Sequence, residues 1–163
     1  MTSFLDPDLD PPTELEGFRV RRARLGRQAG AERLGLSLFE IEPHNAPFPL
    51  HFHLGNEELL IVLSGAIALR TGAGERELDE GEVVALPAGE EGAHQVINRG
   101  QAPARILIAS EMNAPDIVLR PESGKLSAFG TPPGSLDGFH DAYFRRDAVE
   151  FWDGEEPPPP PRS

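Results

Sequence analysis

Three histidines and a pair of glutamates lie at spacings that suit a metal site. His51 and His53 are separated by one residue, Glu57 and Glu58 follow a short loop, and His94 lies on a later segment. Successive side chains of a strand point to opposite faces, so two histidines in this spacing project from the same face. Three imidazole nitrogens and one carboxylate oxygen suit a borderline divalent metal such as Fe, Mn, Ni, Cu or Zn.

The residues around these side chains form two recurring patterns. The first contains His51, His53, Glu58 and Gly65, and the second contains Gly81, Pro87, Gly89, His94 and Asn98. In this order and spacing they resemble the two sequence motifs of the cupin superfamily. The resemblance selects Glu58 over Glu57, because six residues separate Glu58 from Gly65, as the motif requires, whereas Glu57 leaves seven.

Two positions depart from the cupin motifs. The glycine that opens the first motif is replaced by Asn45, which also tolerates positive φ, so we expect the turn to be kept. In the second motif, four residues rather than two separate Gly89 from His94, which bears on the direction in which His94 points.

The resemblance implies an all-β fold, a double-stranded β-helix (jelly-roll) barrel. It implies that His51, His53, Glu58 and His94 bind a divalent metal of undetermined identity, that a small-molecule ligand binds in the barrel, and that the protein is a homodimer. The function it implies is a metal-binding cupin, a small-molecule metalloenzyme of the oxygenase or isomerase type. The alternative is a non-catalytic cupin that binds a small molecule around a structural metal.

Composition and turn residues agree with an all-β protein of one domain. The 163 residues include 17 glycines and 17 prolines, and short apolar segments recur roughly every ten residues with turn residues between them. We expect an N-terminal arm at 1–17, a barrel domain at 18–128, and a C-terminal strap with a proline-rich tail at 129–163.

Charge and hydropathy limit the classes of partner and the cellular location that we expect. A net charge of -12 argues against nucleic acid, whose phosphates require a basic face. It also disfavours a highly anionic substrate, although one local arginine can override the overall field. No cysteine is present, which excludes disulfides and thiolate ligands but does not indicate a compartment. No apolar run is long enough to span a membrane, and the N-terminus is acidic. We therefore expect a soluble, cytoplasmic protein.

Two early segments allow more than one interpretation. Four arginines (Arg19, Arg21, Arg22, Arg24) accompany the segment 18–25, which reads as an edge strand with a solvated basic side, or as a patch for an acidic partner or the chain's own acidic tail. In segment 34–41 the apolar alternation changes parity at Phe39, which predicts a bulge or a change of pairing partner.

The segment after Glu58 is apolar on both faces, which predicts cover on both sides, by a second subunit or a tail. Glu90 or Glu91 could serve as a general base near the metal, with a solvated loop tip as the ordinary alternative. His44 could contact the substrate or simply be exposed.

The C-terminal part changes in composition. Thr131 to Ser135 reads as a linker, the aromatics from 139 to 152 predict a strap over the barrel or a neighbouring subunit, and a lid over the pocket is the functional alternative. Pro157 to Pro161 predict a polyproline II tail.

Overall fold

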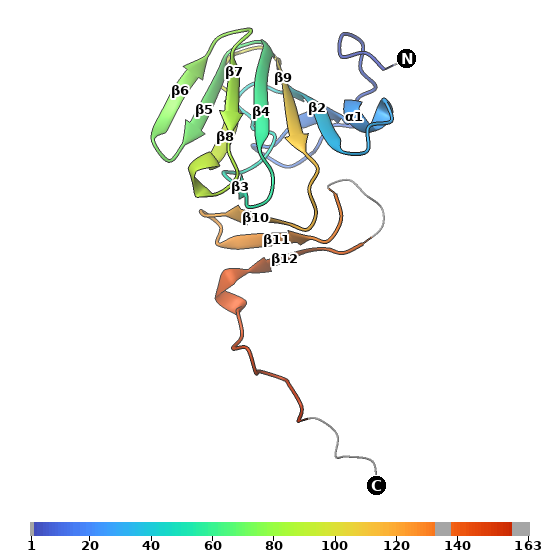
Figure 1. The fold of residues 1–163 in the computed structure, drawn as a ribbon. Helices are drawn as coiled ribbons and strands as arrows, with labels where there is room; N and C mark the ends of the chain where they lie inside the picture. Colours follow the sequence, from blue (N-terminus) through green and yellow to red (C-terminus); the bar gives the residue numbers. More distant parts are fainter. Residues whose placement is uncertain (1, 133–137, 158–163) are drawn as a thin grey trace.

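The structure is a computed structural model that describes residues 2–132 and 138–157, and it is built mainly of antiparallel strands (Figure 1). The strands are β1 (Val20–Ala23), β2 (Leu34–Ile41), β3 (Phe52–His53), β4 (Glu58–Ser64), β5 (Ile67–Thr71), β6 (Gly74–Leu78), β7 (Val83–Leu86), β8 (His94–Asn98), β9 (Ala104–Glu111), β10 (Asp116–Arg120), β11 (Lys125–Phe129) and β12 (His140–Phe144). The helical segments are α1 (Leu25–Gln28) and the 3₁₀ turns η1 (Glu90–Gly92) and η2 (Arg145–Asp147). The prediction of an all-β protein is confirmed.

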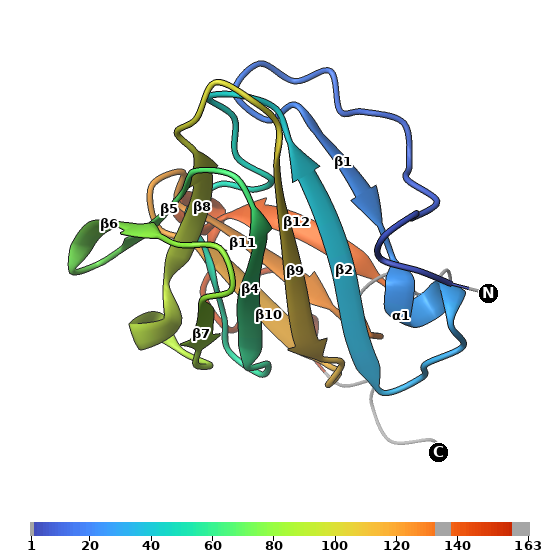
Figure 2. The ribbon, with the colours of Figure 1, turned by 90° about the horizontal axis from the view of Figure 1, so that it is seen from above.

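Five strands form the first layer of the barrel, in the order β1-β2-β9-β4-β7. β2 and β9 pair along their full length, from Leu34 opposite Glu111 to Ile41 opposite Ala104. Figure 2 shows this layer side by side, with β2 and β9 as its longest members.

The opposite layer is made of two shorter sheets that meet at the histidines. One has the order β6-β5-β8 and the other β12-β11-β10-β3. A single antiparallel bridge between His51 and His94 joins them. The layers enclose a core to which the first contributes Ile41, Leu60 and Ile106 and the second contributes Ile67 and Val96. This is the double-stranded β-helix that the sequence resemblance predicted.

Of the two explanations offered for the parity change in β2, the bulge is wrong, and β2 keeps β9 as a partner along its whole length while β1 pairs with it on the other side at 38–41. The pairing of β2 with β9 runs without a shift, and the register shift lies between Val62 and Ser64 in the pair β4–β9. The apolar parity of β2 changes because both of its faces are buried. Phe39 packs in the main core, whereas Leu38 packs in a second cluster on the outer face.

The N-terminal arm covers part of that outer face. Leu9 packs against the second cluster, beside Ile61 of β4. The Asp10 N–H donates to the Arg22 carbonyl at 2.7 Å and the Thr13 N–H donates to the Val20 carbonyl at 3.0 Å, so the arm also satisfies the free edge of β1. Cover on both faces of β4 was expected, and within the chain this arm provides the outer cover together with α1.

The backbone conformation at two turns bears on the glycine positions of the cupin motif. In the turn before the first motif, the positive φ belongs to His44 (φ 62) and not to Asn45, which corrects the expectation. Asn45 instead accepts the Arg19 N–H through its side chain. Gly65 has φ +94, and a Cβ there would lie 2.5 Å from the Cβ of Ala104, so only glycine fits.

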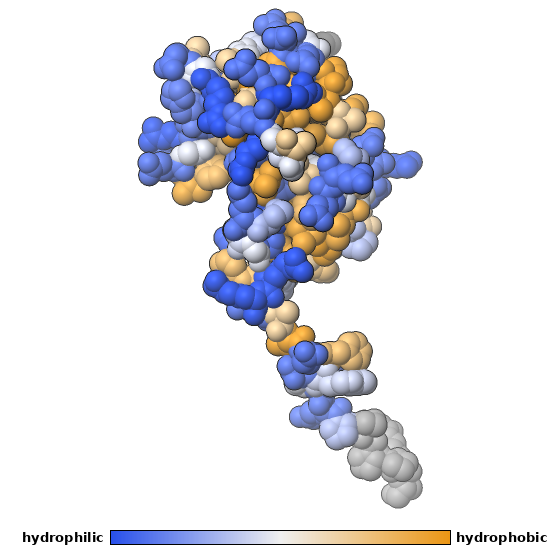
Figure 3. Space-filling view, turned by 90° about the vertical axis from the view of Figure 1, so that its left-hand side faces the viewer, coloured by the Kyte–Doolittle hydropathy of each residue, from blue (hydrophilic) through white to orange (hydrophobic). Residues whose placement is uncertain are grey.

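The C-terminal segment adds a strand at an edge. β12 pairs with β11 from Lys125–Phe144 to Phe129–His140, beneath the barrel rather than across its mouth (Figure 1). From η2 to Pro157 the chain leaves the body as a narrow projection with hydrophobic groups on it (Figure 3). Phe151 and Trp152 are exposed there, so no strap buries them within this chain. Residues 133–137 of the linker and 158–163 of the proline tail lie outside the described residues.

No helix in the described part of the chain is both long and apolar enough to cross a membrane.

Candidate metal centre

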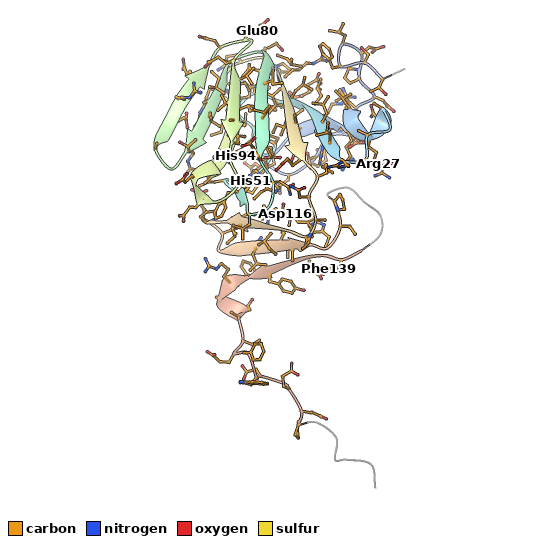
Figure 4. All side chains as sticks on the ribbon, in the orientation of Figure 1. Arg27, His51, Glu80, His94, Asp116 and Phe139 are labelled. Carbon is orange, nitrogen blue, oxygen red and sulfur yellow. The ribbon has the colours of Figure 1, made fainter. Side chains whose placement is uncertain are left out.

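The four residues of the predicted site come from three strands, one in each of the three sheets. His51 directly precedes β3, His53 ends it, Glu58 begins β4 and His94 begins β8. His51 and His94 exchange two backbone hydrogen bonds, N–H to carbonyl, of 3.1 and 2.9 Å. Their ring centroids are 4.6 Å apart, and Figure 4 shows both side chains between the layers of the barrel.

The side chains converge on one point. The ligand atoms of His51, His53 and Glu58 all lie within 4.8 Å of one another, a group that could hold a metal ion. His94 lies beside this group, because its Nε2 is 3.6 Å from Oε2 of Glu58, which is 3.9 Å from Nε2 of His53. The longer loop before His94 forms the turn η1 and still brings the ring to the cluster. Glu57 is exposed, which agrees with the choice of Glu58.

Each imidazole is oriented through its Nδ1 atom. His51 Nδ1 lies 3.1 Å from the Pro49 carbonyl and His94 Nδ1 lies 2.8 Å from the Gly92 carbonyl. Because a carbonyl oxygen only accepts, Nδ1 carries the proton in both rings and Nε2 presents its lone pair. Asn98 takes no part in this, since its side chain bonds backbone groups around the loop that follows β8.

Asp116 orients the third histidine, His53, and no sequence motif indicates this role. Its carboxylate is buried, accepts the Gly55 N–H at 2.9 Å and lies 2.6 Å from Nδ1 of His53. Asp116 begins β10, which pairs with β3 by placing Val118 opposite His53. Figure 4 shows Asp116 just below the histidines. Its 63-residue separation from His53 follows no motif, so only strand pairing reveals the contact.

Burial and charge set the protonation of these groups. Burial lowers the pKa of His51 to about 3, assisted by the neighbouring His94 and His53. Burial also lowers the pKa of His94, which keeps both rings neutral near pH 7. At His53 burial acts in the same direction, but the hydrogen bond with Asp116 and the charges of Glu58 and Asp116 outweigh it and raise the pKa.

The donor set fits a divalent metal. Nε2 of His94 is buried and has no hydrogen-bond partner among the described residues. A buried polar atom without a partner is costly, and coordination to a cation would satisfy it. Nitrogen donors with one carboxylate suit Fe, Mn, Ni, Cu or Zn alike, so the set does not select among them.

Other residues considered from the sequence lie outside this cluster. Glu90 and Glu91 are exposed on η1 and do not line the cavity described below, which gives no support to a general base at either. His44 is also exposed, with Nε2 3.3 Å from Nε2 of Gln101.

A cavity of about 220 Å³ opens beside the cluster. His51, His53 and Glu58 line one side of it. Most of the remaining wall is apolar and comes from β2, β9 and their flanking loops: Leu34, Leu36, Phe39, Phe48, Ile108 and Met112. A small molecule in this cavity would reach the metal ligands while the walls exclude water from its apolar parts.

Three arginines also line the cavity, which corrects the expectation of a purely solvated basic edge. Arg22 of β1 is half-buried and Arg24 and Arg27 lie nearer the rim. Arg24 pairs with Asp10 of the N-terminal arm at 2.7 Å, and Arg21 pairs with Glu40 at 3.6 Å, so these cations have partners within the chain. The sequence did not indicate that Arg22 points inward, because β1 alternates only weakly.

Comparison with known proteins agrees with this geometry. Residues 37–110 match the family model "Cupin domain". The chain is 26% identical to the tetracenomycin polyketide synthase protein TcmJ of Streptomyces glaucescens. The alignment extends over 121 residues and covers 74% of this chain and 76% of TcmJ.

Solved structures share the fold. A sugar phosphate isomerase of the cupin superfamily from Silicibacter pomeroyi has a TM-score of 0.76 at 20% identity, over 94% of this chain and 98% of that one. The polyketide cyclase RemF from Streptomyces resistomycificus has a TM-score of 0.55 at 23% identity, over 68% of this chain and 78% of that one. The family model identifies residues 37–110 as a cupin domain, and the barrel with its structural likenesses supports a small cupin-domain protein.

Proposed function

We propose that this protein is a metal-dependent cupin enzyme that acts on a small molecule, of the oxygenase or isomerase type. The observation that carries the proposal is the buried Nε2 of His94, which lacks a partner and faces Glu58 beside two further histidines. The wider relationship supports it, since one structural relative is named as an isomerase and another as a polyketide cyclase.

The chain's own residues would position the metal and the substrate. Nε2 of His51, His53 and His94 and the carboxylate of Glu58 would hold the ion, and the carbonyls and Asp116 behind them would fix the rings. A divalent ion held by these residues would supply Lewis-acid polarisation of a bound carbonyl or enol oxygen. Phe48, in ring contact with His51 and His94, would shield that oxygen from water.

The first experiment is metal analysis of untagged protein purified without added metal. We expect near-stoichiometric Fe, Mn, Ni, Cu or Zn in the wild type. We expect its loss in His94→Ala, because three donors hold a borderline ion more weakly than four. His140→Ala is the matched control, since His140 lies on β12, is exposed, and does not line the cavity.

Thermal unfolding of each variant shows whether it remains folded. Folded wild-type protein that contains no metal and takes up none of the five ions would overturn the proposal. Metal-loaded protein that binds carbonyl or enol compounds and never converts them would instead assign it to the non-catalytic, small-molecule-binding class.

A further inference from the structure

Arg22 is fixed in one orientation at the wall of the cavity. Its Nε and Nη2 donate to the Ser37 hydroxyl at 3.2 and 2.9 Å, and its guanidinium carbon lies 5.3 Å from the centre of the Phe39 ring. Both neighbours belong to β2, which pairs with β1 along residues 38–41. The side chain is therefore held in place before any ligand arrives.

Arg22 forms no ion pair with another described residue, although the charges of Asp10 and Glu58 act on it from a distance. None of the salt bridges found in the described part of the chain includes Arg22, although its neighbours Arg21 and Arg24 both form one. Burial, with the nearby Arg24, lowers its pKa to about 10, so the guanidinium is still charged at pH 7. Half-buried cations are normally paired, because removing a charge from water is costly.

Each carboxylate near Arg22 either has another partner or is exposed to solvent. Asp10 pairs with Arg24 at 2.7 Å, and Glu58 belongs to the metal cluster. Glu32 is exposed on the loop before β2. With Asp10 counted beside its partner Arg24, three carboxylates (Asp10, Glu32 and Glu58) balance the three arginines around the cavity, and a divalent ion on Glu58 would make the interior positive. This local field opposes the negative net charge of the whole protein.

The remaining wall indicates the body of the ligand. Two aromatic rings connect Arg22 to the metal cluster, because Phe39 contacts Arg22 and Phe48, and Phe48 contacts His51. Ile108 also lines the cavity. An apolar or aromatic scaffold fits such walls, whereas a sugar phosphate would leave its hydroxyl groups without partners there.

We propose that Arg22 binds the carboxylate of a substrate whose oxygen atom, at the other end of an apolar scaffold, reaches the His–Glu cluster. A carboxylate matches the planar guanidinium, and the N–H groups not engaged by Ser37 are the donors it would use. The inference rests on the proposed metal-dependent function, and it names the substrate class: small apolar or aromatic carboxylic acids with a metal-binding oxygen.

The test uses two probes that differ only in the acid group. In 3,4-dihydroxybenzoate a catechol can chelate the metal and the carboxylate lies across the ring, while 4-methylcatechol lacks the charge. Calorimetry on metal-loaded wild type should show tighter binding of the acid. In Arg22→Gln the affinity for the acid should fall about 10- to 100-fold, the range of a charged hydrogen bond, with 4-methylcatechol affinity and metal content unchanged.

Two further variants separate anchoring from general charge or folding. Arg22→Lys keeps a cation and should recover part of the lost affinity, because an ammonium lacks the planar fork. Arg76→Gln removes an exposed arginine on β6 and should change neither probe's affinity. Thermal unfolding of all variants identifies any loss that is due to misfolding, and the comparison of the two probes on wild type needs no variant.

The results that would contradict the proposal can be told apart from one another. Equal affinity of both probes for wild type, or an equal loss of both in Arg22→Gln, would overturn the anchor. Displacement of the acid by inorganic phosphate but not by acetate would overturn the carboxylate assignment in favour of a phosphate ester. If the protein takes up no metal, the metal-dependent function fails, but 4-methylbenzoate, which does not chelate, still reports on Arg22 by itself.

Discussion

Asp116 is a carboxylate that orients His53, one of the proposed metal ligands, without being a proposed ligand itself. It joins His53 and the Gly55 backbone, so the ring and the loop leading to Glu58 are fixed by the same group. The hydrogen bond with His53 also holds the pKa of Asp116 below its usual range, against the opposing effect of burial. A carboxylate behind a histidine ligand increases the basicity of the ring and fixes its tautomer.

Replacing Asp116 by asparagine should therefore weaken the metal site without removing any proposed ligand. We expect metal affinity to fall about 10- to 100-fold in Asp116→Asn, as for comparable partners of ligand histidines. Competition with a chromogenic chelator measures this affinity. Asp79→Asn, an exposed aspartate in the turn before Gly81, is the control. An unchanged affinity in Asp116→Asn would show that His53 needs no such support.

At the scale of elements, the N-terminal arm covers part of the outer face of β4, where the sequence predicted cover by a second subunit or a tail. The arm contributes Leu9 to the cluster around Leu38 and Leu107, and it hydrogen-bonds to the edge of β1. Arg24 and Asp10 fasten it further, although an exposed ion pair of this kind contributes little. Its contribution to stability should come mainly from the apolar contact.

The change Leu9→Ala isolates that contact. We expect a loss of about 1 kcal/mol for a partly buried leucine, or a fall in melting temperature of about 2–4 °C. Leu5→Ala is the matched control, because Leu5 is 77% exposed and should be neutral. Thermal unfolding followed by circular dichroism measures both. Equal effects of the two changes would mean that the arm does not stabilise the barrel in solution.

At the scale of the whole molecule, the C-terminal region presents apolar surface on an unpaired edge. β12 is the outer strand of its sheet, and Phe139, Tyr143 and Phe144 are exposed on or beside it. Phe151 and Trp152 are exposed on the projection that follows. Exposed aromatics next to an open strand edge are typical of protein–protein contacts. We expect this region to pair two copies of the chain, in line with the homodimer that the cupin resemblance implies.

Light scattering coupled to size exclusion tests that expectation. The full chain should show twice its mass of 17.7 kDa, and a variant ending at Gly130 should be monomeric because it lacks β12 and the aromatics. A variant ending at Gly154 keeps them and should remain dimeric. A monomeric full chain, or a dimer that persists without β12, would contradict this role.

Much of the metal site could be predicted from the sequence, because its spacing follows from local geometry. The alternation of a strand places His51 and His53 on one face. The choice of Glu58 over Glu57 rested on the cupin resemblance, whose motif has six residues before Gly65. Gly65 itself is dictated by its backbone angle and by Ala104. The all-β class followed from the regular alternation of short apolar segments and turn residues, while the jelly-roll arrangement rested on the cupin resemblance.

Other features depended on pairing between distant strands, which no local pattern records. Asp116 reaches His53 only because β10 lies beside β3, and Arg22 faces the cavity only because β1 pairs with β2. The change of parity in β2 was mistaken for a bulge, since a strand buried on both faces cannot be told from a shifted one by its alternation. The sequence by itself determined the ligand types and their spacing, whereas the tertiary structure decided which side chains stand behind them, because those contacts join strands far apart in the chain.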